Sequence, residues 1–147
     1  MRRLDAIVVG AGPAGSVAAL VLARGGARVA LVDRRAFPRA KACGDLIGPR
    51  GVRLLAELDI RVPAAGRLGD MVVIGPSGRK ILLPALPGTS HADHALAVPR
   101  EKFDALLFEA ALAAGAVQCM AESADSITAT NAPMAFAWPL ARTSAPM

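Results

Sequence analysis

The spacing of hydrophobic residues changes twice within the first 33 residues. Residues 4–9 (LDAIVV) form a short apolar run rich in β-branched side chains, which predicts a strand. Apolar side chains then recur at helical spacing at Val17, Leu20 and Val21, which predicts a helix with one buried stripe. Residues 28–32 are a second apolar run and predict another strand. The pattern is that of a βαβ unit, and it places the chain in the α/β class.

A β-hairpin and a short helix are predicted in the middle of the chain. The leucines of residues 52–58 have helical spacing and predict one short helix. Two short apolar runs, 71–74 and 80–83, lie on either side of the turn-forming segment 75–78 (GPSG). Such a pair of runs around a Gly/Pro turn predicts a hairpin.

A longer helix is predicted from Pro99 to Ala114, with Gly115 ending it. Charged residues fill its first turns, and we expect that side of the helix to face solvent or a ligand. These charged residues are Arg100, Glu101, Lys102 and Asp104. The expected apolar face consists of Phe103, Leu106, Leu107, Ala110 and Ala114.

Three segments show no clear period. Residues 34–51 and 86–96 are rich in turn-forming residues and are expected to be loops. The second loop contains His91 and His94, but no third ligand is evident in the sequence, so we expect no metal site. Residues 117–147 show neither a strand period nor a turn, and they are expected to be an atypical tail.

The turn between the first strand and the first helix carries the strongest chemical signal. Gly10-Ala11-Gly12-Pro13-Ala14-Gly15 matches a GxGxxG motif. In this motif the first glycine allows the tight turn, the second lets the backbone approach a ligand, and the third lets the helix pack on the sheet. Pro13 suits the first helical position. The free N–H groups and the positive end of the helix dipole then face the turn, which predicts a pyrophosphate site.

Asp33 ends the second strand, 23 positions after Gly10, where an acid can accept hydrogen bonds from ribose hydroxyls. Two alternatives remain at this point: the glycines could serve packing alone, and Asp33 could be an ordinary strand-end acid. Arg34 and Arg35 could instead suit a 2′-phosphate, although the acid argues against one. A strand, a helix and an acid at the expected positions favour a dinucleotide site.

Composition excludes several other classes of function. The net charge is +5, but the basic residues are scattered and aromatic residues make up only 3% of the chain, so nucleic-acid binding is not expected. Two distant cysteines indicate a reducing compartment, and no signal peptide is evident. No stretch reaches the ~20 apolar residues of a membrane-spanning helix. We therefore expect a cytoplasmic protein.

Three motifs in one order resemble the FAD-dependent oxidoreductases of the geranylgeranyl reductase family, within the larger group of flavoprotein monooxygenase-like folds. They are the glycine turn, the loop 37–45 (FPRAKACGD) and the helix 98–116 (VPREKFDALLFEAALAAGA). The resemblance covers residues 4–116. It implies an incomplete Rossmann-type FAD-binding domain over 1–65 and 97–116. Residues 66–96, with the hairpin, would begin a substrate domain.

The resemblance also implies roles for individual residues. Gly10, Gly12 and Gly15, with Pro13 and Ala14 between them, would cradle the FAD pyrophosphate. Asp33, followed by Arg34, would hold the adenosine ribose. Arg100 would lie near the FAD, and Cys43 and Gly44 near the flavin ring and the substrate pocket. Cys43 and Asp45 are the candidate catalytic residues, Asp45 as a proton donor, but an inert cysteine and a turn-forming aspartate are the alternatives.

The reaction implied by the resemblance is the reduction of isoprenoid double bonds by reduced FAD, with NAD(P)H or another electron donor. A lipid-like isoprenoid substrate would go with peripheral contact at the inner face of a membrane. Another flavoprotein of the same fold, such as an aromatic hydroxylase, is one alternative. A non-catalytic nucleotide-binding fragment is the other.

The chain departs from the family pattern in its last 31 residues. Members of the family have a later Gly-Asp motif that contacts the flavin ribityl chain, and this sequence ends before it. The family pattern would also continue after Ala116 with a strand, which the spacing of residues 117–147 does not predict. We therefore expect a frameshift or a truncation near Val117.

Overall fold

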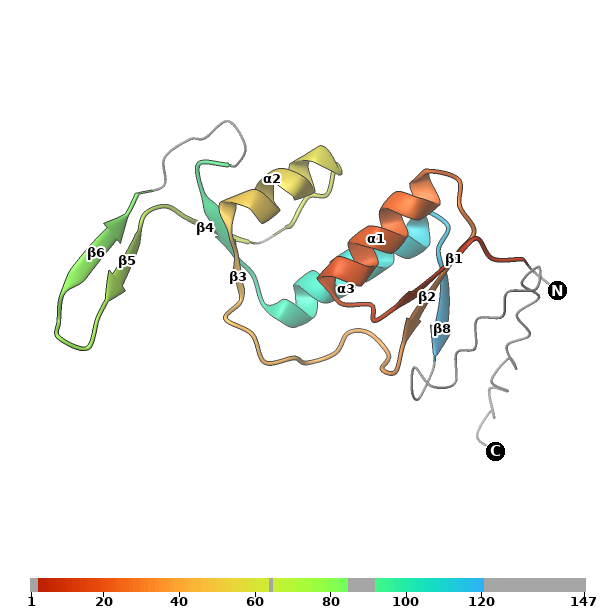
Figure 1. Cartoon of the computed structure of the whole chain (residues 1–147), viewed down its shortest axis with the longest axis horizontal. Coiled ribbons are helices and arrows are strands. Elements are labelled where there is room, and N and C mark those ends of the chain that lie inside the picture. Colours follow the sequence, from red (N-terminus) through yellow and green to blue (C-terminus); the bar gives the residue numbers. More distant parts are fainter. Residues whose placement is uncertain (1–2, 64, 85–91, 121–147) are drawn as a thin grey trace. The chain divides into compact units, whose positions relative to one another are not determined.

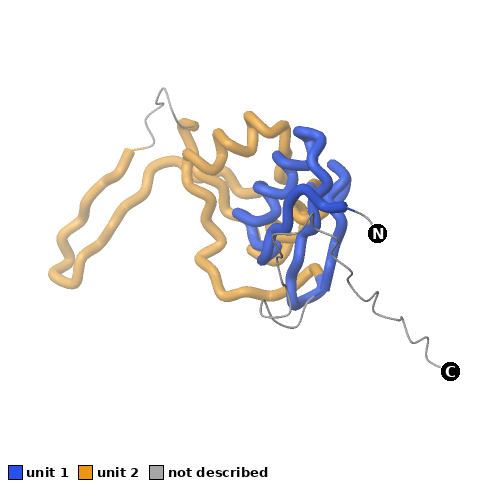
Figure 2. Tube along the Cα trace, turned by 45° about the vertical axis from the view of Figure 1, so that its right-hand side comes forward, with its two compact units in different colours: residues 1–36, 111–147 blue, residues 37–110 orange. Residues whose placement is uncertain are grey.

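The computed structural model describes residues 3–63, 65–84 and 92–120 (Figure 1). The chain divides into two compact units, which Figure 2 colours separately. Unit 1 consists of residues 1–36 and 111–147, and unit 2 of residues 37–110. This division does not test the expected assignment of segments to a cofactor and a substrate domain, which stays a prediction.

Unit 1 contains a parallel three-stranded sheet in the order β1-β2-β8. Strand β1 is Ala6–Val9, β2 is Val29–Asp33 and β8 is Val117–Met120. The central strand β2 is buried from Val29 to Val32, as a strand between two parallel neighbours should be. Helix α1 (Pro13–Arg24) connects β1 to β2, so the predicted βαβ unit is confirmed.

The expectation that no strand follows residue 116 is wrong. Val117 to Met120 pair in parallel with β2, with Ala30 opposite Val117 and Asp33 opposite Met120. Three of the four residues of β8 are exposed, which explains why the sequence shows no clear apolar period there. The strand is defined by its pairing with a buried neighbour more than 80 positions earlier in the chain. Residues 121–147 of the expected tail lie outside the described residues.

Helix α1 is buried on a face of small side chains. Ser16, Ala19 and Leu20 are buried, whereas Val21, expected in the buried stripe, is 48% exposed. Small residues at positions 15, 16 and 19 let the backbone of the helix come close to its neighbours. The face that packs is therefore selected by size as well as by hydrophobicity.

Unit 2 contains a second helix and two antiparallel sheets. Helix α2 is Pro49–Glu57, and its start at Pro49 follows from the fixed φ of proline at the first helical position. One sheet has the order β3-β7-β4. Its strands are β3 (Leu46–Ile47), β7 (Ala95–Ala97) and β4 (Gly66–Leu68).

The other sheet is the predicted hairpin, confirmed as β5 (Met71–Ile74) and β6 (Lys80–Leu83). The loop expected over 34–51 is interrupted by β3 and by the start of α2. The loop expected over 86–96 ends in β7. These strands have only two or three residues, too few to produce a visible alternation of apolar and polar positions.

Helix α3 (Arg100–Ala113) is confirmed within one residue of its predicted ends. It buries Phe103 and Leu107, two of the expected apolar positions, together with Phe108 and Ala111. Asp104 is also fully buried. The expectation that its side chain faces solvent is therefore wrong. Among the described residues, no helix is long and apolar enough to span a membrane.

Candidate functional site

The glycine turn of unit 1 leaves β1 at Gly10 and enters α1 at Pro13. Gly10 has a φ of +93°, a conformation that residues with a Cβ rarely adopt. A Cβ added to Gly15 would lie 1.8 Å from the carbonyl oxygen of Gly10. The first turn of the helix therefore sits directly against the glycine turn, and only glycine at position 15 permits this approach.

The amino-terminal end of α1 has the features of an anion site. Gly12 is the N-cap and provides no side-chain hydrogen bond to the first turn, which also contains no acidic residue. By helix geometry, the N–H groups of Ala14 and Gly15 have no acceptor within the helix. These N–H groups, together with the helix dipole, favour a phosphate at this position.

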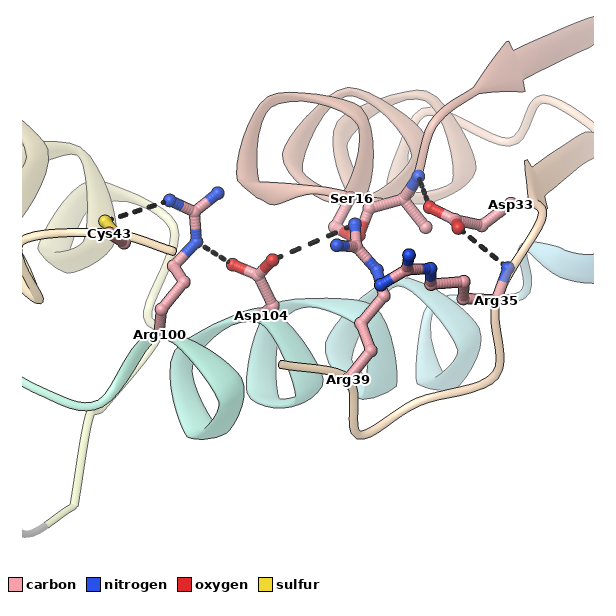
Figure 3. A network of polar contacts seen from close by, with 8 residues as sticks. Ser16, Asp33, Arg35, Arg39, Cys43, Arg100 and Asp104 are labelled. Carbon is pink, nitrogen blue, oxygen red and sulfur yellow. Dashed lines mark hydrogen bonds and ion pairs between the residues drawn. The ribbon is translucent and has the colours of Figure 1, made fainter. Parts of the chain in front are cut away.

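Asp33 connects the end of β2 to the glycine turn (Figure 3). Its Oδ2 accepts a hydrogen bond from the Ala11 N–H at 2.8 Å, and its Oδ1 accepts one from the Arg35 N–H at 3.0 Å. The Ser16 hydroxyl donates to the Ala11 carbonyl at 3.0 Å from a fully buried position. Ala11 is thus held on both sides. The predicted ribose-binding acid and the predicted pyrophosphate turn are parts of one local structure, with Arg34 exposed directly after the acid.

A second cluster lies in unit 2, where α3 begins beside the loop that carries Cys43. The Nη1 group of Arg100 donates to Cys43 Sγ at 3.3 Å. This hydrogen bond lowers the pKa of the Cys43 thiol, and a hydrogen bond from the Asp45 backbone adds to the effect. A Cβ at Gly44 would meet nothing within 4 Å, so this part of the loop is open. Cys43, Gly44 and Arg100, predicted from separate motifs, are brought together here.

Asp45 joins the same loop to the start of α3. Its Oδ1 accepts a hydrogen bond from the Arg100 N–H at 2.9 Å, and its carbonyl accepts one from the Val98 N–H at 2.9 Å. Its φ of +52° is in the left-handed region, which aspartate tolerates better than most residues. The Asp45 carboxylate thus caps a helix, a role close to the turn-forming alternative. Its role as a proton donor stays a prediction.

Asp104 and Arg39 complete this cluster, and neither was among the candidate site residues predicted from the sequence. Asp104 is an ion-pair partner of Arg100 through Oδ1, and its Oδ2 lies 3.9 Å from Nη2 of Arg39. Phe37, stacked on Phe108 with ring centroids 4.4 Å apart, lies under the Arg39 guanidinium. Two signals were present in the sequence. Asp104 is four residues after Arg100, and it shares the helical stripe of Leu107 and Ala111.

Only His94 of the two histidines lies within the described residues. His94 Nδ1 lies 2.6 Å from Asp93 Oδ1, and this contact lowers the pKa of Asp93. His91 lies outside the described residues. Within the described part of the chain, no three His, Cys, Asp or Glu side chains are grouped as metal ligands would be.

Comparison with known families assigns this fold. The family model described as "FAD binding domain" matches residues 3–132. The chain belongs to the FAD-binding domain family. The match includes the glycine turn, both clusters of contacts and strand β8, and it supports FAD as the cofactor.

Named relatives of this FAD-binding domain include two reductases. Menaquinone reductase of Mycolicibacterium smegmatis is 42% identical over 108 residues, which cover 69% of this chain and 25% of the relative. Geranylgeranyl diphosphate reductase of Rhodobacter capsulatus is 39% identical over 117 residues, which cover 78% of this chain and 27% of the relative. The chain spans about a quarter of the length of these relatives.

A solved structure has the same fold. The geranylgeranyl bacteriochlorophyll reductase-like protein of Thermoplasma acidophilum superposes with a TM-score of 0.65 at 28% identity. The superposition covers 80% of this chain and 30% of that protein. The resemblance to the geranylgeranyl reductase family that the three motifs indicated is thus confirmed.

The residues of unit 1 fit the phosphates of FAD. Gly15 lacks a Cβ, Gly10 has a positive φ, and two N–H groups at the start of α1 have no acceptor inside the helix, which are the features that a pyrophosphate cradle needs. The cradle is continuous with Asp33 through Ala11. In unit 2, Arg100 and the loop at Cys43 and Gly44 offer a guanidinium and an open backbone.

Proposed function

We propose that residues 10–15 bind the pyrophosphate of FAD and that Asp33 binds its adenosine ribose. The observation that carries this proposal is the contact at Gly15, where the helix start lies too close to Gly10 for any side chain. With this close approach, the N–H groups of the first turn would face the place where such a motif binds phosphate. Asp33 supports the ribose assignment by its place, because its carboxylate accepts the Ala11 N–H at 2.8 Å and so lies against the glycine turn.

We also propose that the protein acts in flavin-dependent reduction of an isoprenoid or quinone substrate. The names of the two reductase relatives, at about 40% identity, support this reaction over hydroxylation. Bound FAD would supply hydride transfer to the substrate. The proposed electron donor is NAD(P)H. A lipid-like substrate would be reached through peripheral contact with the inner face of a membrane.

The unit 2 cluster supplies the proposed catalytic residues. Arg100, which emerges from the start of α3, would contact the cofactor. Cys43 and Gly44 would lie beside the flavin ring and the substrate, and Asp45 would deliver the proton. The exposed position of Cys43 supports its accessibility to a substrate.

FAD binding is tested by Gly12→Val. Gly12 has φ −72° and ψ −176°, a backbone conformation that valine also adopts, and circular dichroism checks that the variant folds. Its branched side chain would occupy the path of the phosphate. We expect the FAD dissociation constant, measured by flavin fluorescence titration of the whole chain, to rise at least about tenfold, or about 1.4 kcal/mol.

Gly48→Val is the matched control. Gly48 is also an N-cap followed by proline, with φ −69° and ψ 166°, and a Cβ there meets nothing within 4 Å. Its FAD affinity should equal that of the wild type. Equal affinities for both variants would overturn the assignment of the glycine turn to the cofactor.

Reduction is tested separately on the FAD-loaded protein. NADH or NADPH is added without oxygen together with a geranylgeranyl compound or, in a second reaction, with a menaquinone, and product is measured by mass spectrometry. A gain of two mass units for each reduced double bond is expected. Tight FAD binding without any such product would overturn the reductase proposal and leave the cofactor site intact.

A further inference from the structure

The buried carboxylate of Asp104 is the centre of the charged cluster in unit 2. Asp104 is 0% exposed, and the side chains of Arg100 and Arg39 are 19% and 14% exposed. The Nε group of Arg100 contacts Asp104 Oδ1, and Arg39 lies near Oδ2. Such a carboxylate is costly to bury unless cations accompany it, and here two guanidiniums do so.

The contact with Asp104 fixes the direction of the Arg100 guanidinium. This group is planar and presents its N–H donors in a rigid fork. With Nε held by Asp104, the plane is set, and Nη1 is the atom that reaches Cys43 Sγ at 3.3 Å. Figure 3 shows the sequence of contacts from Cys43 through Arg100 and Asp104 to Arg39.

We propose that Asp104 is a positioning residue that aims Arg100 at Cys43 and thereby favours the thiolate form of the Cys43 sulfur. All the residues involved belong to unit 2, so the inference does not rest on FAD binding. The charged groups of the cluster are two guanidiniums, Arg100 and Arg39, and two carboxylates, Asp104 and Asp45. Because these charges cancel, the thiolate depends on the direction of the Arg100 guanidinium and not on the net charge of the cluster.

The groups that act on Cys43 have opposing effects. The hydrogen bond from Arg100 is the largest and lowers the pKa of the thiol, as does the hydrogen bond from the Asp45 backbone. Partial burial and the Asp45 carboxylate raise it. The net effect is a lowered pKa of the thiol, and it depends on the geometry of Arg100, because the hydrogen bond from Arg100 gives the largest contribution.

A positioning role and a simple charge effect predict opposite results for Asp104→Asn. If Asp104 acted only through its negative charge, removing it would stabilise the thiolate further. If it positions Arg100, removing the strong acceptor releases the guanidinium from the sulfur and destabilises the thiolate. The sign of the change therefore separates the two explanations.

The experiment measures the rate of alkylation by iodoacetamide from pH 6 to 10 on the whole chain. Peptide mass spectrometry measures the alkylation of Cys43 and of Cys119 separately. Burial raises the pKa of Cys119, so Cys119 should react more slowly than Cys43 at pH 7 and serves as an internal reference. For Asp104→Asn we expect the midpoint of the Cys43 profile to rise by about one pH unit.

Two further variants keep the test decisive. Arg100→Lys retains the positive charge but lacks the fork that spans Asp104 and Cys43, so its midpoint should also rise. This variant decides the question alone if Asp104→Asn fails to fold by circular dichroism. Glu109→Gln, an exposed carboxylate change on the same helix, should leave the midpoint unchanged. A wild-type midpoint in Arg100→Lys, or a lowered or unchanged one in folded Asp104→Asn, would overturn the proposal.

Discussion

Several single residues in the two clusters have their positions fixed by backbone contacts. Ala11 is held by the Asp33 carboxylate through its N–H and by the Ser16 hydroxyl through its carbonyl. Asp45 accepts two backbone hydrogen bonds, from the Val98 N–H through its carbonyl and from the Arg100 N–H through its carboxylate. Such contacts fix the backbone of a loop without a large hydrophobic core. They explain how short loops can present a defined arrangement of N–H groups and side chains.

Gly15→Ala should test the close approach of α1 to the glycine turn. The added methyl group would overlap the Gly10 carbonyl, so the helix must shift, and we expect a loss of about 3 kcal/mol in the free energy of unfolding by urea denaturation. Gly69→Ala is the control, because a Cβ there meets nothing within 4 Å, and its stability should be unchanged. A stable Gly15→Ala variant would show that the turn is wider than described.

Site residues that belong to a sequence motif could be predicted from the sequence. Site residues that are brought together only by packing could not. Gly10, Gly15 and Asp33 have fixed spacing along the chain, so their proximity could be predicted. The spacing of Asp104 indicated a pair with Arg100 and a place in the apolar stripe, but not its burial, because a charged residue on a helix is normally solvent-exposed. Its burial depends on Arg39, which comes from a loop 65 positions earlier.

At the scale of elements, length and local turn chemistry decided what could be predicted. Helix α3 extends over several turns of regular apolar spacing, and the hairpin is specified by its own GPSG turn. Strands β3, β4 and β7 are short and find their partners far along the chain, as Leu46 opposite Ala97 shows. No local pattern contains that information. Strand β8 was missed for the same reason.

Strand β8 can be tested with substitutions at Cys119, which lies opposite Val32. Proline removes a backbone donor and fits poorly in a paired strand, whereas valine favours one. We expect Cys119→Pro to lower the free energy of unfolding by about 1 to 3 kcal/mol relative to Cys119→Val. Chemical denaturation monitored by circular dichroism measures the difference. Equal stability of the two variants would mean that the Cys119 N–H makes no hydrogen bond to β2.

At the scale of the whole molecule, the most unusual feature is the apolar surface of the β5–β6 hairpin. Met71, Val73, Ile81 and Leu83 alternate with Val72, Ile74 and Leu82, so both faces of the hairpin are apolar. All seven side chains are exposed among the described residues. A water-soluble hairpin normally has one polar face. Exposed apolar surface of this kind promotes association of a protein with other molecules or with itself.

This surface should dominate the association of the isolated chain. Val72 and Leu82 are cross-strand partners and are 52% and 59% exposed. Replacing both with threonine retains a good strand former while adding hydroxyl groups, so the hairpin should be preserved. We expect less aggregation by light scattering and less binding of the dye ANS, with an unchanged free energy of unfolding. Leu54→Gln, which alters a single exposed leucine on α2, is the control and should change neither measurement appreciably. If the double variant aggregated and bound ANS like the wild type, the apolar surface responsible would lie elsewhere in the chain.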